Sequence, residues 1–119
     1  MNRNTRHSLT SPIIGRCVLL IDYVIKYTAK TPKSIKYPYV ETLKVSTGIL
    51  FKYAMYQLKG KDYYKRATEL VSEIQAQTYL LHAIGGITKA HTMTIDVLCD
   101  EIQEQLNSIR FGQSVKIND

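Results

Sequence analysis

The sequence has few of the residues on which catalytic and metal-binding sites depend. Its 119 residues include three histidines (His7, His82 and His91) and two cysteines (Cys17 and Cys99). None of them has the HExxH or CxxC spacing of a metal site, and no pair of carboxylates has the spacing typical of acid–base catalysis. We therefore expect a protein that is not an enzyme, with no catalytic residue, no metal site and no cofactor.

Long hydrophobic runs are also missing. The apolar run Cys17–Ile21 is interrupted by Asp22, whereas a membrane span needs about 18 apolar residues. The segment after Arg3 and Arg6 is polar, unlike a secretory signal. Two cysteines among apolar residues are too few for a disulfide framework, so we expect buried, reduced thiols. These absences predict a soluble, cytoplasmic protein without a membrane segment.

Charge is divided unevenly along the chain. Residues 1–66 contain 13 of the 16 Lys and Arg but 3 of the 10 Asp and Glu, a formal charge of +10, whereas residues 67–119 carry −4. A concentrated basic half attracts polyanions, of which nucleic acid is the commonest. The alternative is a solvated, lysine-rich surface without such a partner. Charge alone leaves both interpretations open.

Hydrophobic periodicity predicts four helices, because apolar residues recur at steps of three and four and no segment alternates like a half-buried strand. The four segments are residues 11–30, 35–58, 62–84 and 94–110. Amphipathic helices with mostly short connections favour an all-α fold, an antiparallel up-down-up-down four-helix bundle over residues 11–112. We expect residues 1–10 to form a flexible basic arm and residues 113–119 a flexible tail.

Capping residues and apolar faces refine this prediction. The expected start signals are Ser11-Pro12, Pro38 in a first turn, Asp62 and Thr94, and the expected stop signals are Pro32, Gly60, Gly85-Gly86 and Gly112. Asp96 then falls in the first turn of the last helix, and His91 in the loop before it. The expected inward residues are Ile14, Val18, Ile21, Ile25 and Thr28; Val40, Leu43, Thr47, Leu50, Ala54 and Leu58; Ala67, Leu70, Ile74, Thr78 and Leu81; Ile95, Leu98, Ile102, Leu106 and Ile109.

Basic residues on the first two helices, on their connection and at the start of the third form a candidate nucleic-acid-binding surface. They are Arg16, Lys26, Lys30, Lys33, Lys36, Lys44, Lys52, Lys59, Lys65 and Arg66. Tyrosines interleave with them, as in Lys36-Tyr37-Pro38-Tyr39, and rings beside cations suit single-stranded nucleic acid. Most of the tyrosines are instead expected at helix or subunit interfaces. The acidic residues of the last two helices form either a solvated face or a contact with the basic half of a second copy.

The segment Gly85-Gly86-Ile87-Thr88-Lys89-Ala90-His91-Thr92-Met93-Thr94, followed by an amphipathic helix, resembles the accessory variability determinant (Avd) family of diversity-generating retroelements. Thr31-Pro32-Lys33-Ser34 and Tyr63-Tyr64-Lys65-Arg66 also resemble elements of this family, and the likeness covers about residues 12–111. The family belongs to a wider group of small four-helix bundles, which includes proteins encoded by intervening sequences in 23S rRNA genes.

The resemblance implies a noncatalytic accessory subunit that binds RNA or DNA and associates with a reverse transcriptase to support mutagenic copying of a template RNA. It also implies a homopentamer with a basic surface, encoded by a bacterium or a phage. Two alternatives stay open. One is an rRNA- or ribosome-associated bundle of the intervening-sequence type, and the other is a protein-binding helical scaffold whose lysines are merely solvated.

Overall fold

The computed structural model describes the backbone of residues 11–118 and the side chains of residues 11–110. All regular elements in this part of the chain are helical, which confirms the predicted all-α class with four long helices. The elements are α2 (Pro12–Thr28), α3 (Lys33–Ile35), the π-helical turn η1 (Lys36–Val40), α4 (Glu41–Leu58), α5 (Tyr64–Ala83) and α6 (Lys89–Asn118). The predicted arm, residues 1–10, lies outside the described residues.

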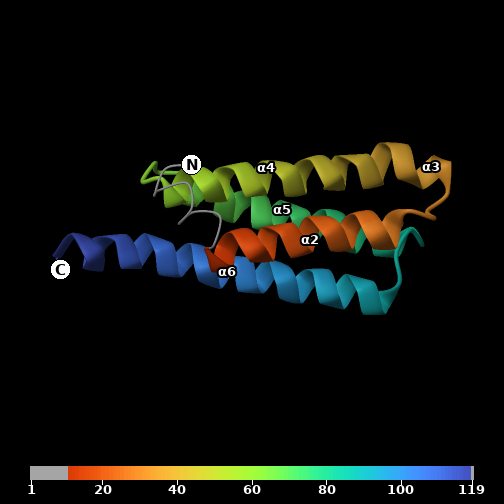
Figure 1. The fold of residues 1–119 in the computed structure, drawn as a ribbon. Coiled ribbons are helices and arrows are strands. Elements are labelled where there is room, and N and C mark those ends of the chain that lie inside the picture. The colour runs from red at the N-terminus through yellow and green to blue at the C-terminus, as the bar shows by residue number, and fades with distance from the viewer. Residues whose placement is uncertain (1–10, 119) are drawn as a thin grey trace.

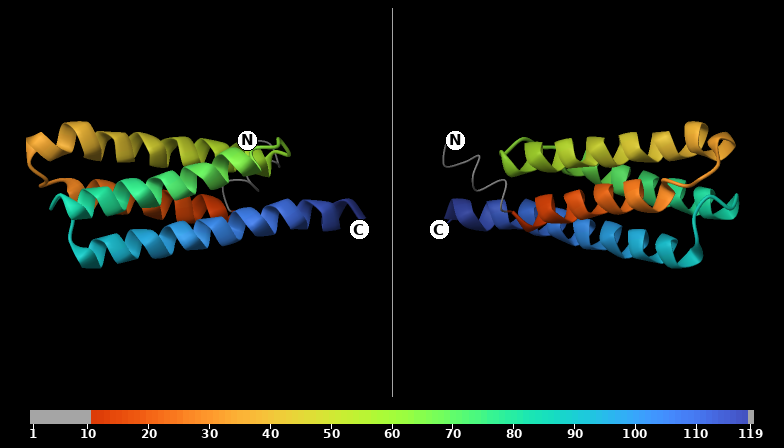
Figure 2. Two further views of the ribbon diagram at one scale, coloured as in Figure 1. Left: turned by 180° about the vertical axis from the view of Figure 1, so that it is seen from behind. Right: turned by 45° about the vertical axis from the view of Figure 1, so that its right-hand side comes forward.

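The four long helices lie side by side (Figure 1, Figure 2). Both α2 and α5 pack against α4 and α6. The connection from α2 to α3 and the connection from α5 to α6 lie at one end, which we call the α3 end (residues 26–36 and 84–91). The turn from α4 to α5 lies at the other end, which we call the Gly60 end (residues 52–66). This arrangement determines which basic residues lie at the same end of the bundle.

Aliphatic side chains from all four long helices form one core. Its fully buried members include Leu20, Leu43, Leu50, Ile74, Leu81, Ile95, Ile102 and Leu106. Burial of each such side chain contributes about 1.5–3 kcal/mol. Every predicted inward residue of α5 is buried. The predicted inward faces of α4 and α6 are also confirmed, although Leu58, Leu98 and Ile109 are only partly buried.

The predicted inward face of α2 is correct for Ile14 and Thr28, which are buried, but wrong for Val18, Ile21 and Ile25. Its buried residues are Ile13, Ile14, Cys17, Leu20, Val24 and Thr28. Val18 and Ile25 are 50% and 49% exposed, and Ile21 is half-buried. Because α2 is apolar on more than one side, periodicity offers two stripes of similar quality. Contacts with both α4 and α6 select the stripe centred on Leu20 and leave the other outside the core.

The helix α6 begins at Lys89 and not at Thr94. The hydroxyl oxygen of Thr88 accepts the backbone N–H of His91 at 3.2 Å, which is the bond made by an N-cap. Thr94 lies inside the helix, where its hydroxyl donates to the carbonyl of Ala90. His91 therefore belongs to the first turn of α6 and not to a loop.

Two further predictions for α6 are also corrected. Asp96 falls in the second turn of the helix, because the helix begins earlier than expected. The backbone continues as helix through Gly112 to Asn118, so α6 does not end at that glycine. A single glycine weakens a helix without stopping it when the neighbouring residues continue the helical backbone.

The turn from α4 to α5 is closed by a glycine, as predicted, but not by the predicted aspartate. Gly60 has a φ of +86°, and the N–H groups of Gly60 and Lys61 bond back to the last turn of α4. Asp62 does not cap α5, whose N-cap position is Tyr63 without a side-chain cap. The buried Gln57 instead accepts the N–H of Tyr63 through Oε1 at 2.8 Å.

The segment around Pro38 departs from the predicted helix start. The helical rod begins at Lys33 in α3, so Pro38 lies in its second turn, inside η1. In the π turn the N–H of Glu41 bonds to the carbonyl of Lys36, five residues back. The wider turn accommodates a residue that has no N–H and whose ring would clash within an α-helix.

Candidate nucleic-acid interface

The predicted basic residues form two groups and not one continuous surface. Lys26, Lys30, Lys33 and Lys36 belong to the α3 end, whereas Lys52, Lys59, Lys65 and Arg66 belong to the Gly60 end. The two groups lie toward opposite ends of α4, whose 18 residues span about 27 Å at 1.5 Å per residue. Among residues 11–110, none of these eight cations forms an ion pair with a carboxylate.

The two remaining predicted residues are engaged with carboxylates. Nε of Arg16 lies 2.5 Å from Oε2 of Glu101 on α6, so Arg16 faces its neighbouring helix and not the outer basic surface. Nζ of Lys44 lies 3.3 Å from Oε1 of Glu41 on the same helix. Both pairs are partly exposed and contribute little stability. Their positive charges are less available to a polyanion than those of the other eight residues.

The Gly60 end combines cations with tyrosine rings. The rings of Tyr53 and Tyr56 lie 5.3 and 4.9 Å from that of Tyr63, centroid to centroid. The Lys61 ammonium lies 5.2 Å from the Tyr56 ring, and the Arg66 guanidinium lies 5.0 Å from the Tyr63 ring. Lys61 was not among the predicted residues, although its position in a connection, like that of Lys33, could have identified it. These tyrosines are half-buried, as the interface interpretation predicts.

The α3 end also exposes aromatic side chains. Tyr37 and Tyr39 flank Pro38 in η1 and are 65% and 42% exposed. They lie on the same segment as Lys33 and Lys36. Because neither ring is buried in the core, both can contact a ligand without unfolding the segment.

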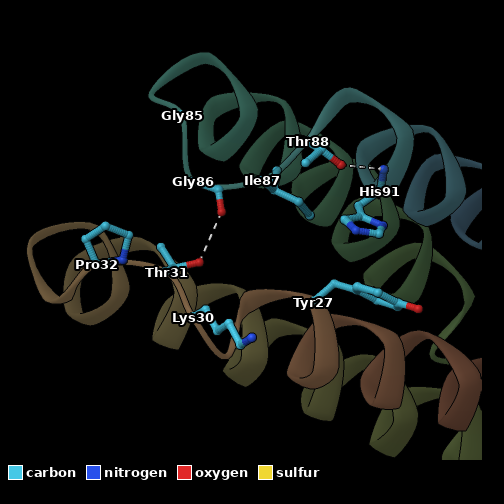
Figure 3. Close-up of a pocket in the computed structure, with 9 residues that line it drawn as sticks. All are labelled: Tyr27, Lys30, Thr31, Pro32, Gly85, Gly86, Ile87, Thr88 and His91. Carbon is cyan, nitrogen blue, oxygen red and sulfur yellow. Dashed lines mark hydrogen bonds between the residues drawn. The ribbon is translucent and has the colours of Figure 1, made fainter.

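A pocket of about 340 Å³ opens at the α3 end between the two interhelical connections (Figure 3). Its lining residues are Tyr27, Lys30, Thr31, Pro32, Gly85, Gly86, Ile87, Thr88 and His91. The Thr31 hydroxyl donates to the carbonyl of Gly86 at 3.1 Å and links the two connections. The lining of the pocket is mixed, with polar side chains from Lys30, Thr31, Thr88 and His91 beside apolar ones.

Gly86 is required by the packing beneath this pocket. A Cβ at this position would lie 2.5 Å from Cδ1 of Leu81 and 3.0 Å from Cγ2 of Ile35. Gly85 has a φ of +83° and ends α5, as the sequence predicted. The glycine pair thus closes one helix and brings the connection against the core.

Aromatic rings form one wall of the pocket. The Tyr27 and His91 rings are in contact, with centroids 4.0 Å apart and planes tilted by 31°. Nδ1 of His91 is hydrogen-bonded to the Tyr23 hydroxyl at 2.8 Å. This hydrogen bond and ring contact join α2 to the first turn of α6 and fix the orientation of the imidazole. The sequence pattern did not predict them, because the histidine was assigned to a loop.

The side of the bundle formed by α5 and α6, opposite the side formed by α2 and α4, is acidic. The side-chain amide of Gln75 donates to Asp96 and Asp100 at 2.9 and 3.0 Å. The Tyr79 hydroxyl donates to Asp96 at 2.6 Å, and this hydrogen bond raises the pKa of Tyr79. Among the described residues, no group of His, Cys, Asp and Glu is arranged to hold a metal ion.

An apolar groove lies between α2 and α4. This α2–α4 groove has a volume of about 320 Å³ and is lined by Val18, Ile21, Asp22, Ile25 and Phe51. It consists largely of the α2 stripe that the sequence had assigned to the core. A half-exposed apolar stripe of this kind is typical of a surface that binds another protein.

The two cysteines are buried and free, as predicted. Burial raises the pKa of Cys17 and of Cys99 to about 12. Neither thiol is therefore suited to nucleophilic or redox chemistry near neutral pH. Within residues 11–118, no helix is both long enough and apolar enough to cross a membrane.

No protein-family model, curated protein or solved structure matches the chain.

Proposed function

We propose that the chain is a noncatalytic, nucleic-acid-binding accessory subunit of a diversity-generating retroelement, of the accessory variability determinant type. In this role it associates with the reverse transcriptase and supports mutagenic copying of a template RNA. The observation that supports this most is the pair of cation clusters, each beside tyrosine rings that are exposed at the α3 end and half-buried at the Gly60 end. Cations bind phosphates, and rings stack with unpaired bases. The proposed location is the cytoplasm of a bacterium or of a phage-infected cell.

The proposal includes an antiparallel up-down-up-down bundle with the two clusters at opposite ends. Short connections between successive helices, each packed against the next, support this topology. A nucleic acid that contacts both clusters must extend along most of α4, whose full length is about 27 Å. We therefore expect longer single strands to bind more tightly than short ones, because they contact more cations.

Assembly into a homo-oligomer, a pentamer by the resemblance, is also part of the proposal. The α2–α4 groove exposes apolar area, and the side formed by α5 and α6 carries carboxylates. These two sides lie opposite each other, because α2 and α5 each pack between α4 and α6. Contact between unlike sides of neighbouring copies forms a ring when the rotation closes.

A salt titration with two charge-reversal variants tests nucleic-acid binding. One variant changes Lys26, Lys30, Lys33 and Lys36 to Glu, and the other changes Lys59, Lys61, Lys65 and Arg66 to Glu, so both alter charge equally. We expect wild-type affinity for single-stranded RNA or DNA to fall steeply with salt, and each variant to bind weakly while keeping its helical circular dichroism. Affinity that is independent of salt, or that survives in both variants, contradicts the proposal.

Co-purification with a reverse transcriptase from the same genome tests the proposed partner. A neighbouring reverse-transcriptase gene and a near-duplicate repeat distinguish the proposal from an rRNA-associated bundle. The α2–α4 groove favours a second candidate, a protein-binding scaffold. Recovery of a protein partner that needs Ile25, together with no nucleic-acid binding at low salt, supports the scaffold instead.

A further inference from the structure

The pocket at the α3 end has the size and the charge of a small anion-binding site. Its volume of about 340 Å³ falls within the range of roughly 300–1,000 Å³ found for ligand pockets. Lys30 lines it and, within residues 11–110, has no carboxylate partner. None of the nine lining residues is acidic. The pocket therefore favours an anion over a cation or a neutral molecule.

The Thr88 hydroxyl and the His91 imidazole line the same pocket as Lys30 and supply further polar groups. The Thr88 oxygen accepts the N–H of His91, which leaves the hydrogen of that hydroxyl free to donate. Nδ1 of His91 is held by the Tyr23 hydroxyl, which leaves Nε2 as the nitrogen available to a ligand. The rings of Tyr27 and His91, in contact at a tilt of 31°, add an aromatic wall beside these groups (Figure 3). A phosphate next to a planar base fits this combination of groups.

We propose that this pocket binds one nucleotide unit of a single-stranded nucleic acid. Lys30 contacts the phosphate, Thr88 and His91 donate hydrogen bonds to its oxygens, and the base or sugar packs against the ring of Tyr27. The assignment rests on the proposed function, because it takes the phosphate from a nucleic acid. A free phosphate compound offers the same chemistry, and the experiment below separates the two sources.

Two measurements on the full chain test the pocket. First, inorganic phosphate and a short oligothymidylate are titrated separately into ¹⁵N-labelled protein, and both should shift the amide signals of residues 86–91. Second, oligothymidylate affinity is measured against salt for wild type, Lys30→Ala and the matched control Lys65→Ala at the Gly60 end. We expect Lys30→Ala to weaken binding about tenfold and to lower the salt slope by about one. Lys65→Ala should weaken it less than about threefold, because Lys65 lines neither of the two pockets described above.

The outcomes separate this inference from the proposed function. If the oligonucleotide binds but Lys30→Ala and Lys65→Ala behave alike, or if the shifted amides lie elsewhere, the pocket is not the site and the proposed function stands. If phosphate shifts residues 86–91 but no oligonucleotide binds at low salt, the pocket serves a free phosphate compound and the proposed function fails. A Lys30→Arg variant that restores affinity and salt slope supports a charge contact over a structural role.

Discussion

The hydroxyl of Tyr23 on α2 and Nδ1 of His91 on α6 lie 2.8 Å apart, and their hydrogen bond joins segments 68 residues apart in the sequence. The ring of Tyr27 contacts the same imidazole. The first turn of α6 is thus attached to α2 through side chains and not through the backbone.

Replacement of Tyr23 by Phe removes this hydrogen bond and keeps the ring. We expect the free energy of unfolding to fall by about 0.5–1.5 kcal/mol, the usual net contribution of such a bond. Urea denaturation followed by circular dichroism measures the change. The matched control is Tyr37→Phe, since Tyr37 is exposed and has no hydrogen bond within the described residues. Equal effects of the two substitutions would show that the Tyr23–His91 bond contributes nothing.

Replacement by alanine should change the stability of the protein in opposite directions at two glycines, Gly86 and Gly48. Gly86→Ala places a methyl group 2.5 Å from the buried Leu81, and we expect a loss of about 1–3 kcal/mol from overpacking. Gly48 lies in α4 with open space around its Cβ position, so Gly48→Ala should stabilise the protein by about 0.5–1 kcal/mol. Thermal melts of the two variants test the pair, and a stabilised Gly86→Ala protein contradicts the packing beneath the pocket.

The stability of the start of α5 should depend on Gln57 and not on Asp62. Gln57→Met keeps the side-chain volume but leaves the N–H of Tyr63 without its acceptor, so we expect a loss of about 1–3 kcal/mol. Asp62→Ala should change stability by less than about 0.5 kcal/mol, because that side chain caps nothing. Urea denaturation measures both losses of stability. A larger loss for Asp62→Ala than for Gln57→Met would support the aspartate cap predicted from the sequence.

Both thiols should be protected from modification in the native protein. With pKa values of about 12, Cys17 and Cys99 remain protonated at pH 8, and their burial excludes a reagent. We expect reaction with a disulfide reagent only after unfolding in urea. Above the unfolded pKa of about 9, ionisation in the unfolded state alone lowers stability as pH rises toward 12. Rapid labelling of the native protein at pH 8 is incompatible with these buried positions.

Assembly should depend on the α2–α4 groove. Ile25→Glu puts a charge into this apolar groove, and a carboxylate should be repelled by the acidic side of a neighbouring copy. Light scattering should give a multiple of 13.6 kDa for wild type and a smaller mass for the variant. Val45→Glu is the control, because Val45 is exposed but does not line the groove. A wild-type monomer excludes self-assembly altogether.

The periodicity of the sequence predicted the buried faces of α4 and α5 well because their polar residues leave one stripe. It failed for α2, where Val18, Ile21 and Ile25 form a second stripe beside the true one. Only the positions of α4 and α6 determine which of the two apolar stripes of α2 is buried. The start of α6 was similarly ambiguous, because Thr88 and Thr94 are chemically equivalent caps. For the candidate site, the list of cations needed only composition and spacing, whereas their separation into two ends needed the packing of the helices.

The π turn at Pro38 has a consequence for how this segment tolerates insertion and deletion. Ile35 packs against the core and Val40 is fully buried, although they lie five positions apart. In an uninterrupted α-helix these two side chains would point about 140° apart. The π turn contains one residue more than an α-helical turn, and it therefore places Ile35 and Val40 on the same face before α4 begins at Glu41. Deletion of Pro38 would leave Ile35 and Val40 four positions apart, about 40° apart on an α-helix, so both side chains would still face the core.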